Sequence, residues 1–89
     1  MKTLPISIII PVYKNYEMFY KYLEINKKFI SDCEVIIMND YPFENITKKT
    51  KEILKTAKVF NNKKNLGFAV NVNKGVKKAT KKICFFNEL

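Results

Sequence analysis

The sequence predicts one α/β domain, over residues 1–89, with a Rossmann-like parallel sheet. Four short apolar runs rich in β-branched residues alternate with three longer segments in which apolar residues recur about every 3.6 positions. Only two glycines and three prolines interrupt the chain, which favours regular elements joined by short connections. The expected order is β-α-β-α-β-α-β, with right-handed crossovers and helices on both faces of the sheet.

The first strand is expected over Ile6 to Tyr13, a nearly continuous apolar run. It is far shorter than the roughly 20 apolar residues of a membrane-spanning helix. Pro11 has no backbone N–H, so the strand should end near it. A helix is expected over residues 16–30, with Phe19, Leu23 and Ile30 on its apolar side and Asn15 as its capping residue.

The remaining elements follow the same alternation. They are expected as a strand over 33–38, a weaker helix over 44–56, a strand over 57–60, a helix over 68–80 and a strand over 83–86. Gly75 falls inside the third helix, where glycine costs about 1 kcal/mol relative to alanine. We therefore expect Gly75 to mark close packing of that helix on the sheet.

Composition excludes several classes of site. The chain has no histidine, which removes Ser-His and Cys-His nucleophiles and histidine metal sites. Its net charge is +9, all of its basic residues are lysines, and most of these fall at helical spacing, as is typical of solvated helix faces. Cys33 and Cys84 belong to no Cys-x-x-Cys pair and are expected to be buried, unreactive thiols. Since no secretory signal or transmembrane segment is recognisable, a cytoplasmic location is expected.

Polar and aromatic side chains follow the first two strands. Tyr13 comes directly after the first apolar run, and Asp40 follows the second. In open α/β sheets, ligands bind just outside the carboxyl ends of the strands. We therefore expect one wall of a binding site at Pro11 and Tyr13, and another at Asp40.

Four segments in order carry a family resemblance: residues 6–13, 34–40, 65–75 and 83–89. Together they resemble the amino-terminal, nucleotide-binding half of a family 2 glycosyltransferase with the GT-A fold. The resemblance spans nearly the whole chain, from Ile6 to Leu89. It implies transfer of a sugar from a nucleoside diphosphate donor, most often a UDP-sugar, to an acceptor hydroxyl with inversion.

The resemblance also implies which residues bind the nucleotide: Pro11, Tyr13, Asp40, Asn65, Gly67 and Asn73. In the family, the loop after the first strand lies against the base, and the acidic residue after the second strand accepts a hydrogen bond from it. The asparagines and the glycine shape the nucleoside pocket. The helix that begins near Gly67 could offer backbone N–H groups to an anion. Lys14 is expected near the base, and Lys63 and Lys64 are expected to attract the diphosphate.

The chain departs from the family pattern at three places. After Tyr13 the family usually has asparagine, whereas this chain has Lys14 and then Asn15. The family often has Asp-Asp-Gly-Ser-x-Asp after the second strand, whereas this chain reads Asn-Asp-Tyr-Pro-Phe-Glu over residues 39–44. After the fourth strand the family has an Asp-x-Asp-like motif for a divalent cation, Mn²⁺ or Mg²⁺. Here the chain reads Asn87-Glu88-Leu89, so Glu88 is the candidate metal ligand and a second carboxylate is absent.

These departures shape the expected activity. The family's acceptor half and general base lie further along the chain, so no residue is assigned as catalytic. We expect a truncated domain that binds a nucleoside diphosphate sugar without completing transfer. The exposed edge of its sheet is expected to favour self-association.

Two alternatives remain open at the level of sequence. A small basic module could bind RNA or single-stranded nucleic acid through its lysines and the rings of Tyr13, Tyr16 and Tyr20, in a salt-sensitive way. Without arginine, specific reading of nucleic acid is not expected. A flavodoxin-like or receiver-like domain is the other alternative, although a receiver needs several acids at strand ends and only Asp40 is available.

Overall fold

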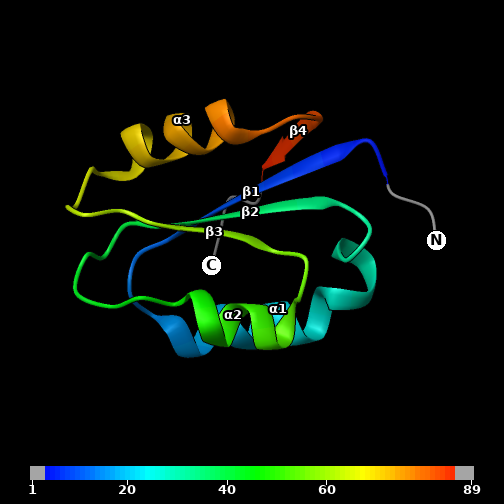
Figure 1. Cartoon of the computed structure of the whole chain (residues 1–89), viewed down its shortest axis with the longest axis horizontal. Coiled ribbons are helices and arrows are strands. Elements are labelled where there is room, and N and C mark those ends of the chain that lie inside the picture. Colours follow the sequence, from blue (N-terminus) through cyan, green and yellow to red (C-terminus); the bar gives the residue numbers. More distant parts are fainter. Residues whose placement is uncertain (1–3, 86–89) are drawn as a thin grey trace.

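The computed structural model describes residues 4–85 and confirms the α/β class and the order of elements (Figure 1). The elements are β1 (Ile6–Val12), α1 (Tyr16–Ile30), β2 (Glu34–Asn39), α2 (Thr47–Ile53), β3 (Lys58–Asn61), α3 (Phe68–Lys78) and β4 (Lys82–Phe85). Most bounds agree with the expected ones within two residues.

The four strands form one parallel sheet in the order β3-β2-β1-β4. β1 lies in the interior, where Ser7 to Val12 pair with Glu34 to Asn39 of β2, and Ile6 to Ile9 pair with Lys82 to Phe85 of β4. The order runs outward from β1 to β3 and then returns to β4 on the other side of β1. The direction of winding therefore reverses between β1 and β4, where open α/β sheets bind ligands at the carboxyl ends of their strands.

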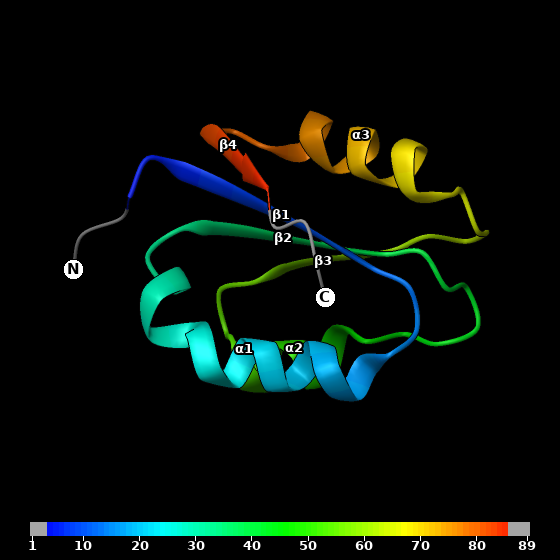
Figure 2. The same ribbon diagram turned by 180° about the vertical axis from the view of Figure 1, so that it is seen from behind.

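Helices cover both faces of the sheet. α1 and α2 lie on one face and α3 on the other, as both views show (Figures 1 and 2). Alternate residues of β1 serve the two layers: Ile8 and Ile10 pack with Phe19 and Leu23 of α1, whereas Ile9 packs toward α3. This two-sided burial explains why the first strand reads as a continuous apolar run.

Gly75 lies where α3 touches the sheet, as expected. A Cβ atom at this position would lie 2.8 Å from Ile9 Cγ2 and 2.9 Å from Met38 Cγ, closer than carbon atoms normally approach. The missing side chain therefore allows the helix backbone to rest directly on β1 and β2.

β1 ends at Val12, one residue after Pro11, as expected. The bounds of the second helix need correction. α2 is shorter than predicted because the segment before it forms a turn, in which the Thr47 N–H donates to Asn45 Oδ1 at 2.9 Å.

Asn15 precedes α1 as expected, but its side chain does not cap the helix. Its backbone is left-handed, with φ 52°. A capping side chain normally needs an extended backbone at this position. Cys84 is exposed, contrary to expectation, because β4 lies at the edge of the sheet.

The carboxylate of Glu34, whose side chain is 7% exposed, ties the amino ends of the strands together. Glu34 accepts hydrogen bonds from Lys58 Nζ and Ser7 Oγ, and from the backbone N–H and hydroxyl of Thr80 at 2.8 and 2.9 Å. The Lys81 N–H in turn donates to Ser7 Oγ at 2.9 Å. The bond from Lys58, followed by that from Ser7, lowers the pKa of Glu34 to about 2. This cluster joins β1, β2, β3 and the start of β4.

Candidate functional site

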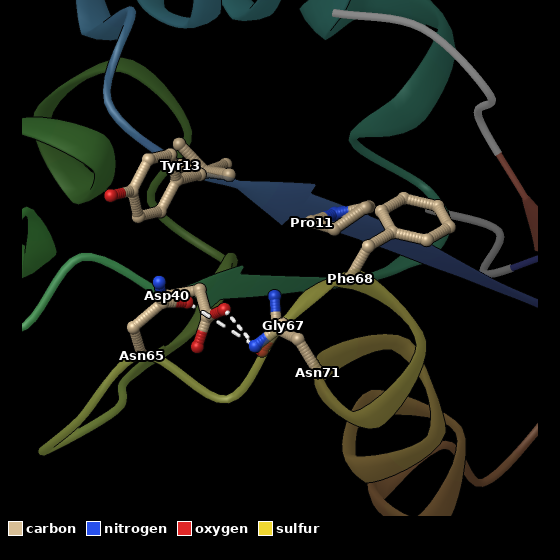
Figure 3. A pocket seen from close by; sticks show the side chains of 8 residues that line it. Pro11, Tyr13, Asp40, Asn65, Gly67, Phe68 and Asn71 are labelled. Atoms are coloured by element: carbon tan, nitrogen blue, oxygen red, sulfur yellow. Dashed lines mark hydrogen bonds between the residues drawn. The ribbon is translucent and has the colours of Figure 1, made fainter.

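A pocket of about 380 Å³ opens at the carboxyl ends of β1 and β2, against the amino end of α3 (Figure 3). It is lined by Pro11, Val12, Tyr13, Asp40, Asn65, Gly67, Phe68 and Asn71. Five of the six residues expected to bind nucleotide therefore come together in one cavity. Its volume falls within the range of roughly 300–1,000 Å³ that is typical of small-molecule sites.

One side of the pocket is aromatic and apolar. Figure 3 shows Tyr13 and Phe68 above the cavity, with Pro11 between them. Tyr13 is 51% exposed and Phe68 is 69% exposed, so neither ring is buried in the core. They offer flat apolar surface to a planar ring such as a nucleobase.

The opposite side is built around Asp40, which is only 4% exposed. Its Oδ1 accepts hydrogen bonds from Asn62 Nδ2 and from the Leu66 N–H, both at 2.9 Å. Its Oδ2 accepts one from the Gly67 N–H, also at 2.9 Å. A carboxylate has about four acceptor sites, and donors within residues 4–85 occupy two on Oδ1 and one on Oδ2.

The backbone conformation at position 67 requires glycine. Its φ is +88°, a region that side chains strongly disfavour, yet a Cβ atom there would meet nothing within 4 Å. This conformation directs the Gly67 N–H toward Asp40. Asn65 Oδ1 shares the same N–H at 3.2 Å.

The amino end of α3 is less available to an anion than expected. The N–H groups of Leu66 and Gly67 both donate to Asp40, so this carboxylate already holds the position next to the helix terminus. These two N–H groups therefore hold the Asp40 side chain in place.

The structure places Asn73, expected in the pocket, on the exposed side of α3, where it does not line the cavity. Asn71 lies there instead: it is 1% exposed, donates to the Met38 carbonyl at 3.0 Å and accepts from Asn62 Nδ2 at 2.7 Å. Helical geometry accounts for the difference. Asn71 is four residues before the sheet-facing Gly75, whereas Asn73 is rotated by about 200° from Asn71.

The spacing of Asn71 from Gly75 could have identified it from the sequence. A glycine expected to touch the sheet fixes which side of the helix faces inward, and a residue four positions earlier shares that side. The buried partner Asn62 carries no comparable signal, because it follows a strand within a polar loop.

The three lysines that were expected to contact the nucleotide lie in two separate places. Lys14 Nζ lies 5.5 Å from the centre of the Tyr13 ring and 4.9 Å from that of Tyr41, and the two rings meet edge to face at 5.7 Å. Lys63 and Lys64 do not line the Tyr13 pocket. They border a separate cavity, together with Lys74.

Two of the three tyrosines in the nucleic-acid alternative are engaged elsewhere. Tyr16 and Tyr20 pack against the core beneath α1 and α2. The Tyr16 hydroxyl donates to Asn39 Oδ1 at 2.9 Å, and burial is the main cause that raises its pKa. Of these three tyrosines, Tyr13 has a half-exposed ring, so the nucleic-acid alternative retains one of its three stacking surfaces.

The candidate metal ligand Glu88 lies outside the described residues. Within residues 4–85, no three acidic, cysteine or histidine side chains come together as a metal-binding group. None of the helices in this part of the chain is sufficiently long and apolar to cross a bilayer.

Comparison with known proteins identifies a family. The model of glycosyl transferase family 2 matches residues 7–87, which is more than half of the chain. A search of curated proteins finds no significant match.

Proposed function

The chain belongs to glycosyl transferase family 2, and from this premise we propose that its pocket binds the nucleotide of a UDP-sugar donor. The sugar would pass to an acceptor hydroxyl with inversion at its anomeric carbon. The observation that carries this proposal is the convergence of Pro11, Tyr13, Asp40 and Gly67 on one cavity. These residues come from two strand ends and a helix start, and the family match gives a common reason for their meeting.

The Asp40 carboxylate supports uridine over cytidine. Uracil carries a ring N–H flanked by two carbonyl groups, and this N–H can donate to Asp40 Oδ2 while the ring lies against Tyr13. Cytosine has an acceptor nitrogen at the corresponding position, which would face the carboxylate without a shared proton. Guanine has a ring N–H but is larger, so GDP tests the width of the pocket.

The divalent cation expected for the family, Mn²⁺ or Mg²⁺, remains part of the proposal. Its candidate ligand Glu88 is outside the described residues, and the described part of the chain supplies no ligand cluster. No step of binding is therefore assigned to a metal.

The test is a titration of UDP into the isotopically labelled chain without metal, followed by amide NMR, with GDP and CMP as competitors. We expect saturable shifts at Tyr13, Asp40 and Asn65, with UDP binding more tightly than either competitor. Small diffuse shifts at lysines that are equal for the three nucleotides and vanish with added salt would refute the pocket and favour nonspecific polyanion binding.

A matched pair of variants locates the site. Tyr13→Leu removes a half-exposed ring beside the pocket, and Phe29→Leu removes an exposed ring on α1. We expect Tyr13→Leu to weaken UDP binding by about tenfold, since base stacking on an aromatic ring contributes about 1–3 kcal/mol. Equal affinity of the two variants would place the nucleotide elsewhere.

A further inference from the structure

We propose that Lys14, whose ammonium group lies over the rings of Tyr13 and Tyr41, binds the phosphate groups of the nucleotide at the mouth of the pocket. This inference rests on the proposed function. It adds to the site a cation that binds the negatively charged phosphates of the ligand. It concerns a position where the sequence departs from the family, since Lys14 stands where the family usually has asparagine.

The neighbours of Lys14 place its charge beside the pocket. Tyr13 lines the cavity, and Lys14 Nζ lies over its ring as well as over the ring of Tyr41. Tyr41 is itself fixed, because its backbone N–H donates to the buried Asn39 side chain at 3.3 Å and its ring meets that of Phe43 at 5.4 Å. The two rings thus limit where the ammonium group can go.

The charge of Lys14 has no carboxylate partner among residues 4–85. In this part of the chain, ion pairs join Lys58 to Glu34 and Lys27 to Glu24, and neither involves Lys14. The aromatic faces attract the ammonium group without neutralising it, and its three N–H donors remain available to an anion.

Two other sources of positive potential, the start of α3 and the lysines near the loop after β3, are already bound to Asp40 or border a different cavity. The Leu66 and Gly67 N–H groups at the start of α3 are bound to Asp40. Lys63, Lys64 and Lys74 border the separate cavity, and Lys74 Nζ donates to Asn62 Oδ1 at 3.1 Å. Within residues 4–85, the ammonium group of Lys14 lies over a ring that lines the pocket, so a phosphate that follows a base held at Asp40 would meet this cation.

The backbone at this loop is also unusual. Lys14 and Asn15 are consecutive non-glycine residues with positive φ, 56° and 52°. Such conformations are disfavoured and often accompany binding loops. Here they form the tight turn from β1 into α1.

The experiment compares uridine with UDP, both without metal, on the intact chain and three variants. Lys14→Met removes the charge but keeps the length of the side chain. Lys14→Arg keeps a cation that stacks on aromatic rings and binds phosphate. Lys21→Met is the matched control, because Lys21 is an exposed lysine of α1.

We expect the intact chain to bind UDP about tenfold more tightly than uridine, because one charge-assisted hydrogen bond to a phosphate is sufficient for a tenfold gain in affinity. Lys14→Met should bring the two affinities together by weakening UDP alone, whereas Lys14→Arg and Lys21→Met should retain the difference. Binding of both ligands with no preference for UDP, or a preference unchanged in Lys14→Met, would overturn this inference while leaving the uridine pocket intact. Failure of the intact chain to bind either ligand would refute the proposed function and this inference together.

Discussion

Replacing Glu34 by glutamine should destabilise the fold in a pH-dependent way. The folded environment lowers the pKa of Glu34 from its ordinary value of 4.5 to about 2. Since each pKa unit corresponds to about 1.4 kcal/mol, this shift represents at most about 3.5 kcal/mol of stability near neutral pH. Lys58 is about half exposed, which weakens its contribution by solvent screening. We therefore expect a loss of about 2 kcal/mol on substitution.

The sign of the pH dependence follows from the lowered pKa. The stabilisation is fully present above pH 4.5, where the unfolded chain also carries the charge, and it is lost as the pH falls toward 2. Domains of this length have free energies of unfolding of roughly 4–13 kcal/mol. A loss of about 2 kcal/mol is therefore readily measurable.

The assay is urea unfolding followed by circular dichroism at several values between pH 3 and pH 7. The difference between the intact chain and Glu34→Gln should be largest at pH 7 and should shrink toward pH 3. Glu24→Gln serves as control, because Glu24 is an exposed partner of Lys27 at 3.6 Å and should change stability by less than about 0.5 kcal/mol. Parallel pH profiles for the intact chain and Glu34→Gln would show that the Glu34 carboxylate does not hold the strands.

Three further outcomes are expected. Gly75→Ala should destabilise by about 1–2 kcal/mol in urea unfolding, because overpacking against Ile9 outweighs the better helix propensity of alanine; a gain in stability would contradict the close contact. Gly67→Ala should cost about 1 kcal/mol through its positive φ and weaken UDP binding, as calorimetry would measure, whereas an unchanged affinity would separate the turn from the site. Asn71→Ala should lower the thermal midpoint because it leaves buried polar groups unpaired, while Asn73→Ala should not; equal midpoints would place both side chains in solvent.

The regular elements could be predicted because they depend on local pattern. The continuous run through Ile8 and Ile10 indicates a strand buried on both faces, and the structure buries it between two helical layers. The helix over 16–30 agrees with α1 at both ends. The prediction for α2 was too long because side chains from outside the helix decide its start: Asn61 Oδ1, on β3, accepts the Ile46 N–H at 3.1 Å.

The sequence by itself determined the parallel α/β class, the strand ends where a site should lie, and the residues Tyr13, Asp40 and Gly67 that meet in the pocket. Alternation of short apolar runs with amphipathic segments leaves few other ways to bury both faces of a sheet. Only the tertiary structure decided that Asn71 enters the pocket in place of Asn73, that Asn62 and two backbone N–H groups fix Asp40, and that Lys14 lies over two tyrosine rings. These contacts join residues distant in the chain, and their geometry depends on how α3 and the loops settle on the sheet, which no local pattern specifies.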